Sequence, residues 1–305
     1  MAEARPRMAL GTVQWGMPYG IGNATGPPSD TELARMLRVA IDLGIDTLDT
    51  ARAYGDAESR LGTTLQALGS GDAFRVVTKV APGIFHAERD DDLPPARQRL
   101  QASVAASADA LAPARIDTLL FHRSDHRTAA GGGLWDVMRS LRERGVVSRI
   151  GISALSPADA LDALEDVSVD VMQVPASLLD QRLARAGFFE AARARGVEVH
   201  VRSVYLQGLA FLEPHRLPPH LAACRPVIEE VRAFAARAGY EVADVWLDHA
   251  RTLPADHLVI GTESVAQLTR NAERFQRPCL DGIAAFAAEL PLLGDEVLDP
   301  ARWPG

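Results

Sequence analysis

Four polar side chains follow short apolar segments in the first half of the chain. Asp49 ends one such segment, and Tyr54 follows it within the next loop. Lys79 and His122 lie at the ends of the next two apolar segments. Parallel strands of a barrel present their carboxyl ends on one face. If these segments are such strands, a carboxylate, a phenol, an ammonium and an imidazole share one site.

This set of groups is suited to supplying a proton. A tyrosine in water has a pKa of about 10, and a nearby ammonium lowers the pKa of a phenol because it favours the phenolate. We expect Asp49 to hold Lys79 in place and Tyr54 to protonate a carbonyl oxygen as hydride reaches its carbon. His122 would orient the carbonyl. Taken singly, each residue also has a non-catalytic interpretation. His122 could be a core histidine, Lys79 a side chain that extends to water, and Tyr54 a packing residue. Their joint placement favours catalysis.

The elements that must position these groups are short, continuous apolar runs, as parallel strands covered on both faces require. The eight predicted strands are Met8–Val13, Asp46–Thr50, Arg75–Val80, Asp117–His122, Arg149–Ser153, Asp170–Pro175, Glu198–Val204 and His257–Gly261. Helical patterns separate them, and no composition break divides the 305 residues. We therefore predict an α/β fold, a (β/α)8 TIM barrel, as a single domain over residues 1–305. A doubly wound sheet is the alternative, weakened because no G-x-G-x-x-G follows the first strand.

Helix ends support this arrangement. Ser29-x-x-Glu32 has the pattern of a capping box. Ser156, followed by proline, is typical of an N-cap. Gly145 and Gly196 each stand between an arginine-rich helix end and a strand, as C-cap glycines do.

Three long connections follow predicted strands, at the face where barrel enzymes have their sites. They cover residues 15–28, 123–133 and 206–226. With the C-terminal tail, residues 281–305, we expect them to shape the mouth of the active site.

The bulk properties narrow the class of function. The net charge of -8 argues against a nucleic-acid partner, because an acidic surface repels phosphate backbones. The two cysteines offer neither a disulfide framework nor zinc spacing. The first seven residues lack the apolar run of a signal peptide, and no apolar stretch is long enough to span a bilayer. We expect a cytoplasmic protein with no membrane or nucleic-acid partner, as a monomer or small homo-oligomer.

Three stretches together resemble a known family. The residues from Gly44 to Gly62, GIDTLDTARAYGDAESRLG, are similar to the aldo-keto reductase signature, and VTK ending at Lys79 and LFH ending at His122 resemble that family's lysine and histidine strands. The similarity extends from Leu10 to Asn271. It implies a bacterial aldo-keto reductase whose catalytic tetrad is Asp49, Tyr54, Lys79 and His122, with Tyr54 as general acid.

The resemblance also implies a nicotinamide cofactor lying across the barrel mouth without a Rossmann domain. The positions that it assigns to the cofactor are Gly11, Thr12, Asp49, Ser153, Gln173, Arg202, Ser203, Leu206, Gln207, Gly208, Gly261, Thr262, Glu263, Ser264, Gln267 and Asn271. The positions expected to contact substrate are Trp15, Tyr54, Phe85 and His122. The segment from Gly261 begins a helix, whose free N–H groups suit an anion.

Three residues depart from the family pattern. Ala154 stands where asparagine is common, which removes one amide contact. Arg202 replaces an aromatic residue that stacks on the nicotinamide. We expect its guanidinium to form a similar shelf, and the alternative is that it binds an anion of the substrate or cofactor. Glu263 lies where NADPH-specific members carry a cation, although Arg270 follows on the same helix. NADP(H) is favoured by the resemblance, and NAD(H) is possible because of Glu263.

The predicted function is an NAD(P)H-dependent oxidoreductase that reduces an aldehyde, ketone or sugar carbonyl, or oxidises the alcohol. A non-catalytic nicotinamide-binding sensor of the same fold is the alternative. A cofactor-free aldolase using Lys79 as a Schiff base is a third possibility. His122 and His126 are spaced four apart, but in a loop, so we expect no metal site.

Overall fold

The computed structural model describes residues 5–23, 26–85 and 93–304. Within these residues, parallel strands close into a barrel in chain order. The strands are β1 (Arg7–Gly11), β2 (Thr47–Asp49), β3 (Arg75–Val80), β4 (Ile116–Phe121), β5 (Arg149–Ser153), β6 (Val171–Pro175), β7 (Glu198–Arg202) and β8 (His257–Gly261). Pairing of β1 with β8 completes the ring. The predicted (β/α)8 barrel and its eight strands are confirmed, with ends that differ by at most two residues.

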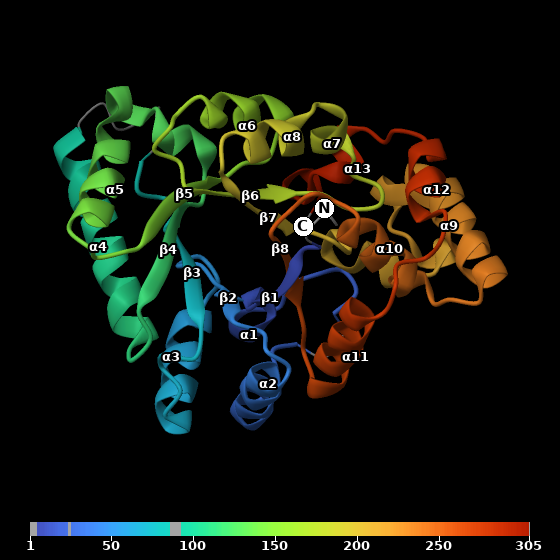
Figure 1. Cartoon of the computed structure of the whole chain (residues 1–305), viewed down its shortest axis with the longest axis horizontal. Helices are drawn as coiled ribbons and strands as arrows, with labels where there is room; N and C mark the ends of the chain where they lie inside the picture. Colours follow the sequence, from blue (N-terminus) through green and yellow to red (C-terminus); the bar gives the residue numbers. More distant parts are fainter. Residues whose placement is uncertain (1–4, 24–25, 86–92, 305) are drawn as a thin grey trace.

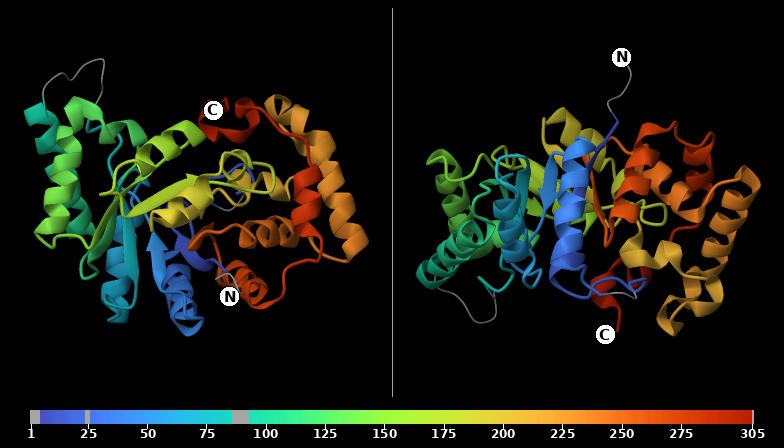
Figure 2. Two further views of the ribbon diagram at one scale, coloured as in Figure 1. Left: turned by 45° about the horizontal axis from the view of Figure 1, so that its top comes forward. Right: turned by 90° about the horizontal axis from the view of Figure 1, so that it is seen from below.

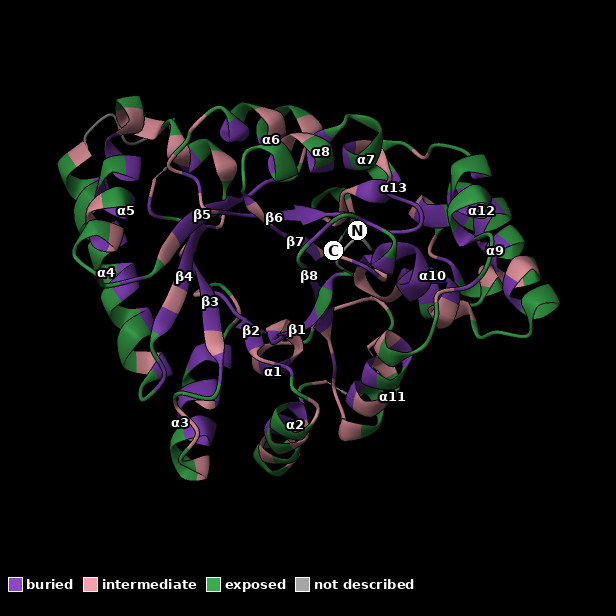
Figure 3. Ribbon diagram, in the orientation of Figure 1, coloured by how far each residue is buried: buried purple, intermediate pink, exposed green. Residues whose placement is uncertain are grey.

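Helices cover the outside of this ring (Figure 1). They are α1 (Val13–Gly16), α2 (Asp30–Asp42), α3 (Ala57–Leu68), α4 (Leu93–Leu111), α5 (Gly133–Glu143), α6 (Pro157–Leu164), α7 (Arg182–Arg185), α8 (Phe188–Ala194), α9 (Arg225–Ala238), α10 (Val242–Arg251), α11 (Val265–Gln276), α12 (Ile283–Glu289) and α13 (Asp295–Leu298). Figure 3 shows the strands buried and the helices with one buried and one exposed face, as an outer layer requires.

Short 3-10 helices occupy the long connections. They are η1 (Ser124–Arg127), η2 (Ala129–Gly132), η3 (Leu206–Phe211), η4 (Pro214–Arg216), η5 (Pro219–Cys224) and η6 (Pro300–Arg302). The expectations for the start of the chain, for residues 24–25 of the first long loop and for the last residue of the tail lie outside the described residues.

The predicted helix ends are confirmed, with one correction. Ser29 caps α2 by accepting a hydrogen bond from the Glu32 N–H at 3.2 Å, and Gly145 and Gly196 have φ values of 69° and 68°. The capping box does not close, however. The Glu32 carboxylate instead accepts the N–H of Val265 at 2.8 Å, at the first residue of α11. The first and last large helices of the barrel are thus tied together.

The inward faces of the strands form layers. Side chains alternate between the two faces of a strand, so Lys79 and Val77 face the interior while Val76 and Val80 pack against the helices in the main core. Val77, Leu120 and Val171 form a small apolar cluster within the barrel. Polar side chains lie above it at the carboxyl ends of the strands and below it at the amino ends.

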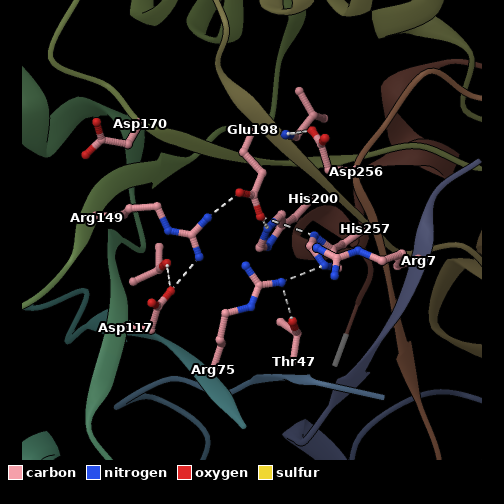
Figure 4. A network of polar contacts seen from close by, with 12 residues as sticks. Arg7, Thr47, Arg75, Asp117, Arg149, Asp170, Glu198, His200, Asp256 and His257 are labelled. Atoms are coloured by element: carbon pink, nitrogen blue, oxygen red, sulfur yellow. Dashed lines mark hydrogen bonds and ion pairs between the residues drawn. The ribbon is translucent and has the colours of Figure 1, made fainter. Parts of the chain in front are cut away.

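The lower layer is a network of charges (Figure 4). Arg149 contacts both Glu198 and Asp117. The Glu198 carboxylate also lies 2.8 Å from Nε2 of His200 and 3.2 Å from Nδ1 of His257. Polar side chains from β4, β5, β7 and β8 therefore contact one another and fill this end of the barrel.

A second apolar core lies beside the barrel. It is formed by the segment after β7 together with α9, α10, α12 and α13, and includes Trp246, Ile228 and Phe286. Figure 2 shows these helices as a group at one side of the strands. Trp303 of the tail packs against this core and donates to the Val297 carbonyl at 3.2 Å. Packing on this second core thus holds the end of the tail in place.

The loop that carries Tyr54 is fitted closely against α1. A Cβ atom on Gly16 would lie 1.9 Å from the backbone oxygen of Tyr54 and 2.4 Å from the nitrogen of Ala57. Gly55 has a φ of 58°, and a Cβ there would lie 2.3 Å from the Gly16 oxygen. Only glycine permits this approach of two backbones. The glycines therefore set the height of Tyr54 above the barrel.

We predict that Gly16→Ala lowers the free energy of unfolding by about 3 kcal/mol, because the new methyl group meets backbone atoms that cannot rotate away. Gly69→Ala is the control: Gly69 has a φ of 62° and open space around it, so only the left-handed backbone costs about 1 kcal/mol. Urea denaturation measures both. Equal losses in the two variants would contradict the close fit at Gly16.

Candidate functional site

The structure brings the four predicted catalytic residues together. Asp49 is the last residue of β2, Lys79 lies near the end of β3, and His122 directly follows β4. Lys79 donates to both oxygens of Asp49 at 2.8 Å and to the Thr50 carbonyl at 2.9 Å. Both charged side chains are almost completely buried. Parallel strands with consecutive order place this ion pair directly under the loop of Tyr54.

The Lys79 side chain carries a proton. Burial acts to lower the pKa of Lys79, but the contacting carboxylate of Asp49 and the nearby phenol of Tyr54 outweigh it, so the pKa is raised. A lysine that forms a Schiff base must first lose this proton. The arrangement therefore disfavours the aldolase alternative and supplies a fixed positive charge instead.

Tyr54 and His122 lie on the open side of the ion pair. The Lys79 Nζ is 5.0 Å from the centre of the Tyr54 ring. The rings of Tyr54 and His122 meet edge to face with centres 5.8 Å apart. Burial, with the charges of Lys79 and Arg202, lowers the pKa of His122 to about 4. His122 is therefore neutral at physiological pH and can make hydrogen bonds without adding charge.

A cavity of about 570 Å³ extends from Asp49 and Tyr54 across the barrel mouth to α11. The predicted cofactor residues that line it are Gly11, Thr12, Asp49, Arg202, Ser203, Gln207, Gly208, Gly261, Glu263, Gln267 and Asn271. Other lining residues come from residues 19–23 of the first long loop and from η3. The described residues of 123–133 and of the tail contribute no lining residue. The first and third long loops thus border the cavity.

Other predicted cofactor residues lie behind this lining. Ser153 and Gln173 are buried, and the Gln173 amide donates to Asp49 Oδ1 at 2.7 Å. The Gln173 Oε1 atom is buried with no hydrogen-bond partner among the described residues. Leu206 and Thr262 are buried too. The free acceptor on Gln173 fits a ligand amide, which carries N–H donors.

The backbone after β7 is strained where it borders the cavity. Ser203, Leu206 and Gln207 have positive φ values of 61°, 43° and 53°, and Gly208 follows with 90°. Residues other than glycine rarely adopt this conformation, and such strain clusters at ligand sites. Ser203 also explains why β7 ends two residues earlier than predicted. This segment fits a loop shaped to hold a ligand.

The start of α11 differs from the prediction that its N–H groups are free to bind an anion. The N–H of Val265 donates to Glu32, and the N–H of Gln267 donates to the N-cap Ser264 at 3.3 Å. The Gln267 side chain accepts the N–H of Glu263 at 2.8 Å. Because these donors are occupied, an anion here depends mainly on arginine side chains.

The substrate residues need one correction. Trp15 is completely buried and donates from Nε1 to the Thr262 carbonyl at 3.0 Å. It is a core residue that joins the segments following the first and last strands, so its predicted role in binding substrate is wrong. Phe85 is half-buried and packs against the main core. Tyr19, from the glycine-rich first loop, does line the cavity near Tyr54, and burial raises its pKa.

Histidines occur together in two places where a metal ion could be considered. His126, expected not to act with His122 as ligand, is buried with its ring edge to face against Phe121. In the lower layer, Glu198, His200 and His257 place ligand atoms within 4.8 Å of one another. Arg75 Nη2 lies 3.2 Å from Nε2 of His257. Since arginine can only donate, the proton of neutral His257 is on Nδ1, which lies 3.2 Å from the Glu198 carboxylate. Arg75 and Glu198 thus contact both ring nitrogens of His257 and Nε2 of His200, while Nδ1 of His200 has no hydrogen-bond partner among the described residues.

A comparison with family models finds a match to the Aldo/keto reductase family over residues 7–281. A Pseudomonas protein named D-threo-aldose 1-dehydrogenase is 27% identical, over 96% of this chain and 97% of its own. The oxidoreductase sirO of Leptosphaeria maculans is 29% identical over 49% of this chain and 43% of its own. The holo structure of an aldo-keto reductase from Bacillus halodurans has the same fold, with a TM-score of 0.71, 19% identity and coverage of 97% and 95%. None of the described helices could cross a membrane.

The buried histidines predict a pH dependence of stability. Burial lowers the pKa of His249, like that of His122, to about 4, whereas an unfolded histidine titrates near 6.5. As pH falls from 6.5 to 4, the unfolded chain takes up protons that the folded chain does not, so the free energy of unfolding decreases. Each shift corresponds to roughly 3 kcal/mol at the end of this range. Urea denaturation at several pH values measures the loss.

His249→Leu serves to check the assignment, because it removes one titrating group from the interior. Its stability should fall less steeply between pH 6.5 and 4 than that of the parent. A parent protein with constant stability over this range, or a variant with the same slope, would show that the histidines are not responsible.

Proposed function

The chain belongs to the Aldo/keto reductase family and is an oxidoreductase, and on this premise we propose that it transfers hydride to the carbonyl of an aldehyde, ketone or sugar, or from the corresponding alcohol, with Tyr54 as general acid. The observation that carries the proposal is the buried pair of Asp49 and Lys79 beneath Tyr54. A nicotinamide cofactor, when bound, supplies or accepts the hydride. The chain's own groups position the carbonyl and move the proton.

The proton path follows from the geometry. The Tyr54 hydroxyl gives its proton to the substrate oxygen, and the phenolate left behind is stabilised by the positive charge of Lys79. Asp49 keeps that charge in place, since both of its oxygens accept from Nζ. Neutral His122, beside the Tyr54 ring, hydrogen-bonds the same oxygen and holds it toward Tyr54. In the oxidative direction the same atoms take the proton back.

The proposed place for the cofactor is the cavity between Tyr54 and α11. Ser153 and the free Gln173 oxygen, close to Asp49, suit the carboxamide of a nicotinamide. The strained segment from Ser203 to Gly208 suits a pyrophosphate, and Asn271, which accepts from the Tyr205 hydroxyl, lies toward the adenosine end. Residues from both ends of the chain thus surround one elongated ligand.

For the cofactor we propose NADP(H). Arg270 and Arg274 line the cavity on α11. Arg274 is already paired with Glu241 and Asp244, whereas Arg270 is exposed and able to reach a 2′-phosphate. Glu263, which also lines the cavity, opposes this preference and leaves NAD(H) as the alternative. The name of the Pseudomonas relative, an aldose dehydrogenase, supports a sugar among the candidate substrates.

Tyr54→Phe tests the general acid. We expect turnover of aldehydes to fall at least 100-fold, because proton transfer contributes about 10²–10⁴-fold, while cofactor still binds and quenches tryptophan fluorescence. Tyr240→Phe is the matched control, since Tyr240 is an exposed surface residue, and it should keep the parent rate. Equal rates in parent and Tyr54→Phe would refute the proton donor. Cofactor binding without turnover in the parent would instead favour the sensor.

Arg270→Ala tests the cofactor preference. Loss of a charged hydrogen bond to the 2′-phosphate should weaken NADPH binding about tenfold and leave NADH binding nearly unchanged, as measured by fluorescence titration. Arg277→Ala, on an exposed residue just beyond the same helix, should affect neither cofactor. A parent that binds NADH more tightly than NADPH would show that Glu263 decides the preference.

A further inference from the structure

One charged residue at the substrate end of the cavity has no counterion in the described part of the chain. Arg202 ends β7, is half-buried and lines the cavity together with Tyr54. Its Nη1 donates a hydrogen bond to Oγ of Ser203 at 3.1 Å. By contrast, two other arginines of the lining have carboxylate partners: Arg232 lies 2.8 Å from Glu213 and Arg274 contacts Asp244.

An unpaired guanidinium in a half-buried position is costly, since it loses water without gaining an opposite charge. Lys79, the other positively charged residue near Tyr54, does have an opposite charge beside it. Lys79 is neutralised by two contacts to Asp49. Among the described residues, the substrate end of the cavity therefore has one positive charge without a carboxylate partner, and that charge belongs to Arg202.

The position of this charge is close to the reacting groups. Its field is one cause of the low pKa of His122, and it acts on Tyr19 across the mouth as well. Tyr19 hydrogen-bonds Gln207 and lies within electrostatic range of Tyr54. Because Arg202 and Tyr54 line the same cavity, a ligand whose carbonyl lies at Tyr54 can present a second group to Arg202.

We propose that Arg202 is a specificity-determining residue that binds an anionic group, a carboxylate or a phosphate, on the carbonyl substrate. This inference rests on the proposed function. The planar guanidinium can donate two parallel hydrogen bonds to either oxyanion, and Ser203 fixes its orientation from one side. An anionic group on the substrate would supply a counterion for Arg202. Stacking of Arg202 against a nicotinamide ring would not supply one.

The test compares substrates that differ only in charge, with the cofactor saturating. One arm uses succinic semialdehyde against butanal, and the other uses glyceraldehyde 3-phosphate against glyceraldehyde. In the parent, kcat/KM for the charged substrate should be at least ten times that for the neutral one in one of the two arms. The arm that shows this difference identifies the bound group as a carboxylate or a phosphate. Arg202→Gln should reduce the ratio of these two kcat/KM values at least tenfold, and Arg202→Lys should reduce it less. Arg277→Gln, at an exposed arginine outside the cavity, should leave the ratio unchanged.

Two further measurements keep the test independent of turnover. The cofactor-loaded parent should bind succinate or inorganic phosphate in a calorimetric titration, and Arg202→Gln should not. Without ligand, Arg202→Gln should have an unchanged or higher Tm, because it removes an unpaired charge, whereas Arg182→Gln, which breaks pairs with Asp180 and Asp295, should have a lower one. An unchanged ratio in Arg202→Gln, or equal anion binding by parent and variant, would overturn the inference. Absence of turnover with anion binding retained would overturn the proposed function alone.

Discussion

The buried ion pair between Asp49 and Lys79 is the contact on which the mouth of the barrel depends. Each charge would be costly alone in this interior, and each is neutralised only because the two strands end side by side. Gln173 adds a hydrogen bond to Asp49 from the opposite side of the barrel. The pair therefore fixes the relative heights of β2, β3 and β6, and the Tyr54 loop lies on this fixed base.

Charged side chains also have partners at the other end of the barrel, where the strands begin. There the inward positions carry Arg75, Arg149, Glu198 and His257, and each of these side chains has a polar partner. A thin apolar layer around Val77 separates this network from the site above. The two polar layers differ in one respect: the lower one pairs its arginines with carboxylates and a histidine, whereas within the described residues the upper one leaves Arg202 without a carboxylate and the Gln173 oxygen without a hydrogen-bond partner.

The strand ends were predictable from the sequence because a polar residue that closes an apolar run can only lie at the rim of a barrel. Asp49, Lys79 and His122 were found in this way. Local patterns do not say what a side chain meets far along the chain. Trp15 follows a strand like Tyr54 does, yet it turns into the core toward Thr262. Glu32 has the spacing of a capping box but caps a helix 233 positions away. The unpaired state of Arg202 also required the three-dimensional arrangement.

The ties between the two ends of the chain have a consequence for synthesis in the cell. Pairing of β1 with β8, the Trp15 contact to Thr262 and the cap of Glu32 on α11 all join residues more than 200 positions apart. During synthesis, the full set of these contacts cannot form until the chain has been made as far as α11. Until then β1 has an open edge, and the cavity lacks one wall. The complete cavity therefore forms only late in synthesis, and until then the open edge of β1 is exposed to pairing with other chains.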